Sequence, residues 1–140
     1  MLLLLLALTT PPDAALPPGP AIPPARDCAL YDLIHREQLS RRADTDDGIQ
    51  LRVSPGTGVA AHLVCPGWRI TGPAPSEIVV FEPPVWSRRG VSACVDFSVL
   101  HFNHHWDTRR VTGRSMHRCE LRRQGTAWRL KACRQIAGDR

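Results

Sequence analysis

Three histidines and a carboxylate gather between His101 and Asp107, in the segment HFNHHWD. Imidazole and carboxylate groups are ordinary ligands for zinc and copper, so His101, His104, His105 and Asp107 are candidate metal ligands. The spacing His-x-x-His-His matches no standard site on a helix or a strand. A solvated loop at the tip of a hairpin is therefore the alternative to a metal site, and we expect no cofactor.

Arginine dominates the charged residues. The 140-residue chain carries 17 arginines and one lysine against 13 acids, for a formal charge of +5. The excess is uneven, because residues 105–140 hold ten basic side chains against three acids, whereas residues 1–104 hold eight against ten. A basic carboxyl-terminal part would attract phosphate-rich polymers or anionic envelope surfaces through salt-sensitive contacts.

Motifs typical of enzymes are missing. The sequence contains no nucleophile elbow, P-loop, dinucleotide fingerprint or H-E-x-x-H motif, so no enzyme class receives direct support. The balance of charge, together with a hydrophobic share of 43%, predicts a folded core rather than a disordered polyelectrolyte.

The amino-terminal part has the pattern of an export signal. Leu2–Leu8 form an apolar run of seven residues, too short to span a bilayer, which needs about 20 residues. The run suits the apolar core of a signal peptide, although no basic residue precedes it. Seven prolines between Pro11 and Pro24 favour an extended spacer. We therefore divide the chain into a signal peptide and Pro-rich linker (1–27) and one small domain (28–140), secreted or periplasmic, with no transmembrane or lipid anchor.

One helix is expected after this linker. Leu30, Leu33, Ile34 and Leu39 recur at helical spacing and predict a helix over 29–42, with Asp27 as its N-cap. Pro-Gly and Gly-Pro steps interrupt residues 49–75. Short strands at 49–53 and 68–70 and a helical turn at 59–64 are expected there.

Turn residues divide the remainder into four β-rich runs, at 78–87, 91–102, 110–123 and 126–136. If Ser87 faces Val91 across the first hairpin, then Val79 faces Val99, Phe81 faces Phe97 and Val85 faces Ala93, so one face is apolar. Pro83-Pro84 can lie only at an edge or a bulge, which predicts a bent edge strand.

The last hairpin gives a second register. A turn at Gln124-Gly125 puts Arg123 opposite Thr126, and pairs Leu121 with Trp128, Cys119 with Leu130 and His117 with Ala132. The apolar face is again on one side, and it must be covered. The fold class predicted is α+β: an N-terminal helix packed on a curved, cone-like, four-stranded antiparallel meander.

These registers assign the polar side chains to faces. A basic face should point outward, and its expected members are Arg114, Arg118, Arg122, Arg129 and Lys131. Glu120 should lie opposite Arg129 and neutralise the face in part. His101 and His117 should point to the covered face with Ser87 and Ser115, where they could line a ligand pocket or act as acid and base. Core histidines with backbone partners are the alternative.

Five cysteines in a small exported domain predict disulfides, and the odd count leaves at least one thiol. We expect a bridge from Cys28 to Cys65. Cys94 and Cys133 are the other candidates, since the register puts both on the outer face. A bridge between Cys119 and Cys133 is disfavoured, because Cys119 points the other way.

The order of elements, ending in LRRQGTAWRL (Leu121–Leu130), resembles the SnoaL-like proteins of the nuclear transport factor two superfamily over about half of the chain. The resemblance implies a pocket between helix and sheet, which that superfamily uses for small ligands, for catalysis or for dimer contacts.

The sequence therefore predicts an exported binding or interaction domain. Its partner would be a small ligand in the helix–sheet pocket or an anionic envelope component on the basic face. One alternative is a SnoaL-like pocket enzyme with a histidine acid or base; another is a structural envelope-associated protein. Nucleic acid is the weaker partner, because only Trp86 and Phe102 are expected to offer aromatic surface on the basic face.

Overall fold

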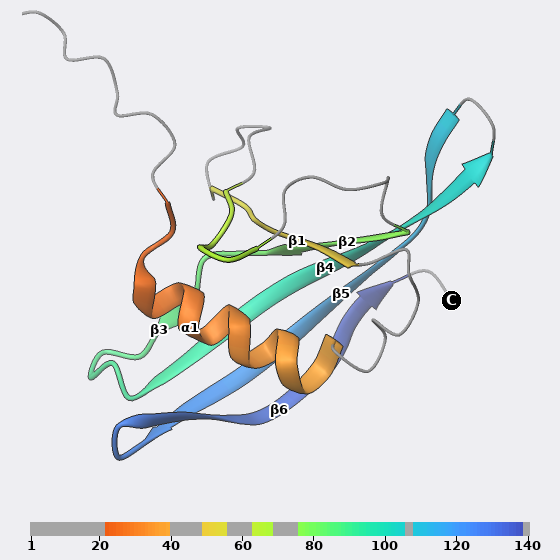
Figure 1. Ribbon diagram of the computed structural model, residues 1–140. Helices are drawn as coiled ribbons and strands as arrows, with labels where there is room; N and C mark the ends of the chain where they lie inside the picture. The colour runs from red at the N-terminus through yellow and green to blue at the C-terminus, as the bar shows by residue number, and fades with distance from the viewer. Residues whose placement is uncertain (1–21, 40–48, 56–62, 69–75, 106–107, 139–140) are drawn as a thin grey trace, which may run out of the picture.

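The computed structural model describes residues 22–39, 49–55, 63–68, 76–105 and 108–138; the side chains of residues 103–105 and 108–110 are not described. One helix lies across one face of a twisted sheet (Figure 1). The elements in chain order are α1 (Ala25–Ile34), a π-helical extension (His35–Leu39), β1 (Ile49–Val53), β2 (Glu77–Phe81), β3 (Val85–Trp86), β4 (Ser92–His105), β5 (Thr108–Gln124) and β6 (Ala127–Gly138). The expected export signal lies outside the described residues.

Helix α1 begins earlier than expected. The Pro24 carbonyl accepts hydrogen bonds from the amides of Asp27 (2.9 Å) and Cys28 (3.0 Å), so Pro24 is the N-cap residue. The prediction that Asp27 caps the helix is wrong. Its carboxylate instead lies in the first turn, where the helix dipole favours negative charge. Burial nevertheless raises the pKa of Asp27, and the positive charge of the neighbouring Arg26 offsets only part of this rise.

The sheet has six strands in the order β1-β2-β4-β5-β6, with β3 beside β4. Strand β1 has the predicted bounds, but it pairs in parallel with β2. The predicted four-stranded antiparallel meander is therefore wrong: the sheet is mixed and open. A parallel pair needs a long crossover connection, and the residues that supply it, 54–76, have no regular period.

The irregular middle segment is described in part. Leu63 forms an antiparallel bridge with Val53, so this end of the helical turn expected at 59–64 is extended instead. Trp68 lies outside any strand, and its indole N–H donates to the Asp32 carboxylate at 2.9 Å. The other residues of the two elements predicted at 59–64 and 68–70 lie outside the described ranges, except Val64, which has no regular structure.

The first hairpin has the predicted register over β2 and loses it at the two prolines. Val79 faces Val99 and Phe81 faces Phe97, as predicted. Beyond Pro83-Pro84, which lack the amide N–H that a sheet ladder needs, the register shifts by one residue. Val85 pairs with Cys94 and Trp86 with Ala93.

This shift reverses the predicted faces of three side chains. Trp86 turns to the helix side, whereas Val85 points outward and is 71% exposed. Ser87 follows Val85 to the outer face and not to the covered one. The prolines interrupt the pairing with β4, but β2 is not the predicted edge strand, because β1 pairs with its other side. The short β3 lies at an edge instead.

The last hairpin turns one residue later than predicted. Gly125 has φ +64°, in the left-handed region that glycine tolerates, and Gln124 pairs with Ala127. Leu121 therefore faces Leu130 and not Trp128. Lys131 is an extra residue in β6, because the next pair is Glu120 with Ala132.

This bulge at Lys131 moves residues 132–135 of β6 to the opposite face, until a second extra residue, Ile136, restores the predicted alternation. Cys119 faces Cys133 and His117 faces Gln135, so the predicted partners Leu130 and Ala132 are wrong. Cys119 and Cys133 form a disulfide with a Cα–Cα distance of 4.1 Å, which the predicted register had disfavoured. The predicted bridge between Cys28 and Cys65 is confirmed. Cys94 is the remaining free thiol, so its place among the disulfide candidates is wrong.

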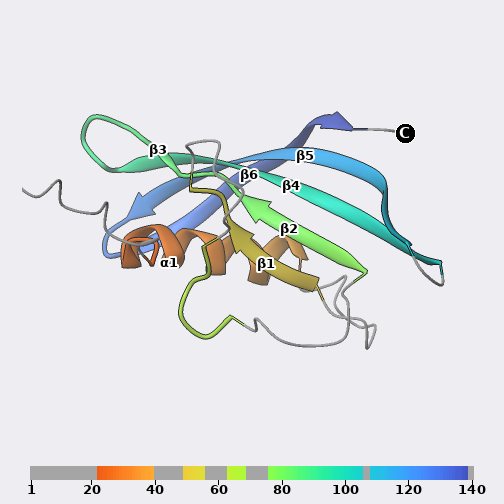
Figure 2. The ribbon, with the colours of Figure 1, turned by 90° about the horizontal axis from the view of Figure 1, so that it is seen from above.

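The core fills the space between α1 and the sheet. Tyr31 stacks on Phe81 with ring centroids 4.8 Å apart, and Phe81 contacts Phe97 at 5.5 Å. Leu30 and Ile34 are fully buried beside them. Figure 2 shows α1 on one side of the sheet, and no described helix covers the opposite side.

The two disulfides suggest an oxidising compartment outside the cytoplasm. Within the described ranges, no helix has the length and apolar character needed to cross a membrane.

Candidate functional site: a basic sheet face and its groove

A row of basic side chains occupies the sheet face away from the helix. The basic face consists of residues that alternate outward on β5 and β6: Arg114, Arg118, Arg122, Arg129, Lys131 and Arg134. Five of them are exposed and Arg118 is half-buried. Arg134 was missed by sequence reasoning, because the bulge at Lys131 reverses its expected direction. A register shift between His101 and Phe102 interrupts the alternation on β5 before Arg110, whose side chain is not described.

Like charges face one another across β5 and β6. Arg122 is directly opposite Arg129, and Arg118 is directly opposite Arg134. Glu120 faces Ala132, so the predicted pairing of Glu120 with Arg129 is wrong. Like charges in directly opposed positions destabilise a sheet. The fold therefore concentrates positive charge here at some cost to its own stability.

One member of the basic face is neutralised. Arg118 donates from Nε and Nη2 to the two carboxylate oxygens of Asp96, each at 2.8 Å. The hydrogen bonds from Arg118 hold the pKa of Asp96 below its ordinary value. By contrast, Arg122, Arg129, Lys131 and Arg134 have no ion pair with a carboxylate anywhere in the described residues.

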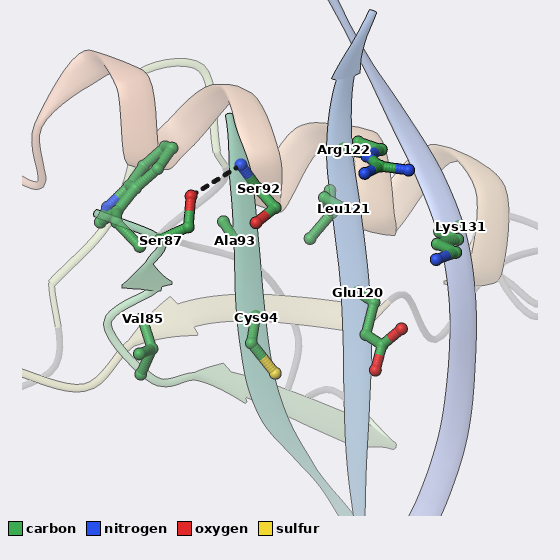
Figure 3. Close-up of a pocket in the computed structure, with 10 residues that line it drawn as sticks. Val85, Ser87, Ser92, Ala93, Cys94, Glu120, Leu121, Arg122 and Lys131 are labelled. Carbon is green, nitrogen blue, oxygen red and sulfur yellow. Dashed lines mark hydrogen bonds between the residues drawn. The ribbon is translucent and has the colours of Figure 1, made fainter. Parts of the chain in front are cut away.

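Two of these cations, Arg122 and Lys131, line a groove of about 410 Å³ (Figure 3). Its volume is within the range of small-molecule sites, about 300–1,000 Å³. Strands β3, β4, β5 and β6 all contribute to its lining, which comprises Val85, Trp86, Ser87, Ser92, Ala93, Cys94, Glu120, Leu121, Arg122 and Lys131. The amide of Ser92 donates to the Ser87 hydroxyl oxygen at 3.1 Å, which fixes the closed end of this hairpin.

Cys94 lies between this groove and a second hollow of about 310 Å³. Asp96 and Arg118 contribute to the second hollow. Burial raises the pKa of the Cys94 thiol, and Asp96 and Glu120 add to the rise, while Arg118 and Arg134 oppose it. The thiol is thus less ionised at neutral pH than a free cysteine, which does not favour a nucleophilic role.

A smaller cavity lies between the helix extension and the sheet. Its volume is about 150 Å³, and Gln38, Phe97 and His117 are among its lining residues. The His117 ring stacks on Phe97 at 4.9 Å, and its Nε2 is 3.0 Å from the Ser115 hydroxyl. Both polar side chains predicted for the covered face of β5 therefore lie side by side.

His101 does not join His117. Its Nδ1 is 3.0 Å from the Glu77 carboxylate, at the far end of β2, and His101 is not among the residues that line this cavity. The other carboxylate oxygen of Glu77 is buried and has no hydrogen-bond partner among the described atoms. The structure thus separates the two candidate acid–base histidines.

The predicted metal ligands extend the sheet. Strand β4 continues through His104 and His105, which pair with Arg109 and Thr108, so these histidines are part of a β-ladder rather than of a loop. Their side chains, and the whole of Asp107, are not described. Among the described residues, no group of three or more potential ligands is arranged to hold a metal ion.

Comparisons with family models, with curated proteins and with solved structures give no match.

Proposed function

We propose that this chain is an exported binding module, secreted or periplasmic, that holds an anionic ligand on its basic face. The observation that carries the proposal is the pair of directly opposed cations Arg122 and Arg129, exposed and without a carboxylate partner in the described residues. A bound anion would lie between the two guanidinium groups and remove their repulsion.

The chemistry of the side chains supports an anion with several oxygen atoms. A guanidinium group is planar and offers paired N–H donors that match phosphate, sulfate and carboxylate oxygens. The disulfide between Cys119 and Cys133 ties β6 to β5 next to Arg118 and Arg134. The basic face is thereby held in one geometry before a ligand arrives, which reduces the entropy cost of binding.

The test compares two double variants with the same change in net charge. The first is Arg122→Glu with Arg129→Glu, on the basic face. The second is Arg88→Glu with Arg89→Glu, at exposed positions of the hairpin between β3 and β4. Binding to dextran sulfate and to inorganic polyphosphate is measured by calorimetry across a series of NaCl concentrations.

We expect the wild-type affinity to fall steeply with salt, because binding releases counterions. The basic-face variant should lose most of its affinity and the hairpin variant little. Equal losses in the two variants would show that only net charge matters. An affinity that does not change with salt would contradict the proposal altogether.

The helix–sheet cavity supports a second candidate, the SnoaL-like pocket enzyme. The contact between Ser115 and His117 beside a cavity is the observation that favours it, since a hydroxyl next to an imidazole can exchange a proton with it. A screen of small esters and hydroxylated acids against the wild type and His117→Ala tests the idea. An activity that survives this substitution would exclude His117 as its acid or base.

A further inference from the structure

We infer that the groove of Figure 3 takes an anionic saccharide, that is, a sugar unit bearing a sulfate, phosphate or carboxylate group. The inference rests on the proposed anion binding and names the class of ligand. The groove combines two cations, one carboxylate, two serine hydroxyls and an apolar wall, and a ligand must satisfy all four.

The cations define one end of the ligand. Arg122 and Lys131 both line the groove, and neither has an ion pair elsewhere in the described part of the chain. The arginine offers a fork of N–H donors and the lysine a compact point charge. An anionic group placed between them receives several hydrogen bonds and is neutralised.

Glu120 disfavours a ligand that is only an anion. It is the next outward residue on β5 after Arg122, its side chain lines the same groove, and it has no ion-pair partner among the described residues. An ionised carboxylate only accepts hydrogen bonds, so it repels a bare phosphate chain and calls for donors. Sugar hydroxyls are such donors, and they lie within a few ångströms of the sulfate or phosphate on the same ring.

The opposite wall fits the rest of a sugar ring. Ser87 accepts a hydrogen bond from the Ser92 amide, and its hydroxyl hydrogen is left to donate to a ligand oxygen. Val85, 71% exposed, adds apolar surface for the C–H groups of the ring. This mixture of a few directed polar groups with apolar surface is typical of small-ligand sites.

Cys94 provides a reporter inside the groove. It is the one free thiol of the five cysteines, so a maleimide reagent applied to the unreduced protein modifies this position alone. A ligand in the groove covers the thiol and slows its alkylation. The rate is followed by intact-mass spectrometry with dextran sulfate, with uncharged dextran, and with polyphosphate at equal charge concentration.

We expect dextran sulfate to protect Cys94, uncharged dextran to give no protection, and polyphosphate to need about a tenfold higher concentration, the value of one hydrogen bond to a charged group. In Glu120→Gln, the two polyanions should protect Cys94 at similar concentrations. The substitution removes the negative charge that repels polyphosphate and that accepts hydrogen bonds from sugar hydroxyls. Lys131→Glu should abolish protection by either polyanion.

The remaining outcomes separate the two proposals. Equal protection by polyphosphate and dextran sulfate in the wild type would overturn the saccharide assignment and leave the anion-binding function standing. Salt-sensitive binding of dextran sulfate without protection of Cys94 would place the ligand outside the groove and also overturn it. If neither polyanion binds, both proposals fail.

Discussion

Replacing Arg129 by glutamate should make the protein more stable while it weakens anion binding. Arg129 lies directly opposite Arg122, and neither has a carboxylate partner in the described residues. The substitution turns a repulsive cross-strand pair into an attractive one. It also removes a cation from the proposed binding face. If the surface were basic only because the chain is rich in arginine, there would be no reason to expect a gain in stability together with a loss of anion binding.

The size of the stability gain follows from the geometry of the pair. Directly opposed residues of an antiparallel pair have Cβ atoms about 5 Å apart, and two charged groups about 6 Å apart in water interact with about 0.7 kcal/mol. Reversing the sign of one charge changes this by about 1.4 kcal/mol. Salt screening and the entropy of long side chains reduce the net gain to about 0.5–1 kcal/mol.

Urea unfolding at low and at high salt measures this gain. Arg129→Glu should unfold at a higher urea concentration than the wild type at low salt, and the difference should shrink as NaCl is added. Arg129→Gln, which removes only the repulsion, should give about half the effect. Arg129→Glu should also lose affinity for dextran sulfate. A variant that is less stable than the wild type, or that binds as tightly, would refute the argument from opposed arginines.

Three further predictions concern the scaffold. Replacing both Cys119 and Cys133 by alanine should lower the free energy of unfolding by about 3 kcal/mol, as measured by urea unfolding. The reason is that the disulfide, with a sequence separation of 14, restricts the entropy of the unfolded chain by about this amount. Phe81→Ala should cost about 3–5 kcal/mol in thermal or urea unfolding, since Phe81 is fully buried, whereas a loss below about 1 kcal/mol would contradict the described core. Arg118→Gln should raise the pKa of Asp96. Because a lowered folded-state pKa stabilises the protein above the unfolded-state value, the stability lost in this variant at pH 7 should disappear as the pH falls below about 4, in unfolding curves taken at several pH values.

The helix and the central register were predictable because local patterns determine them. The spacing of Leu30, Leu33 and Ile34 allows one buried helix face, and the structure buries all three residues. The alternation around Val79 and Phe81 predicted the register of β2 against β4 correctly, although Ile78 and Val80, which point to the other face, are buried as well.

The errors arose where one residue breaks an alternation. The pairing with β4 is interrupted at Pro83-Pro84 and resumes with its register shifted by one residue. The alternation of apolar and polar residues does not predict how many residues such an interruption contains. Lys131 shifts the register in the same way within β6. The cysteines held a usable signal: a turn at Gly125-Thr126 would put Cys119 opposite residue 132, so a single bulge is enough to bring it opposite Cys133.

The candidate site was predictable in part for the same reason. Arg122, Arg129 and Lys131 were expected on the outer face and are lined up there. Arg134 lies beyond the bulge, so its direction could not be predicted. The groove depends on the outward turn of Val85, which follows the break at the prolines, and no sequence pattern indicates its depth.

The most direct test of the central claim is to observe the arginine side chains during ligand titration. The Nε–Hε signals in ¹H–¹⁵N spectra, assigned by substitution, report each guanidinium separately as dextran sulfate is added at low salt. Our account predicts that the signals of Arg122 and Arg129 shift first, while those of Arg88 and Arg89 and the ring signals of His117 stay in place. Shifts confined to His117, or equal shifts at all four arginines, would contradict it.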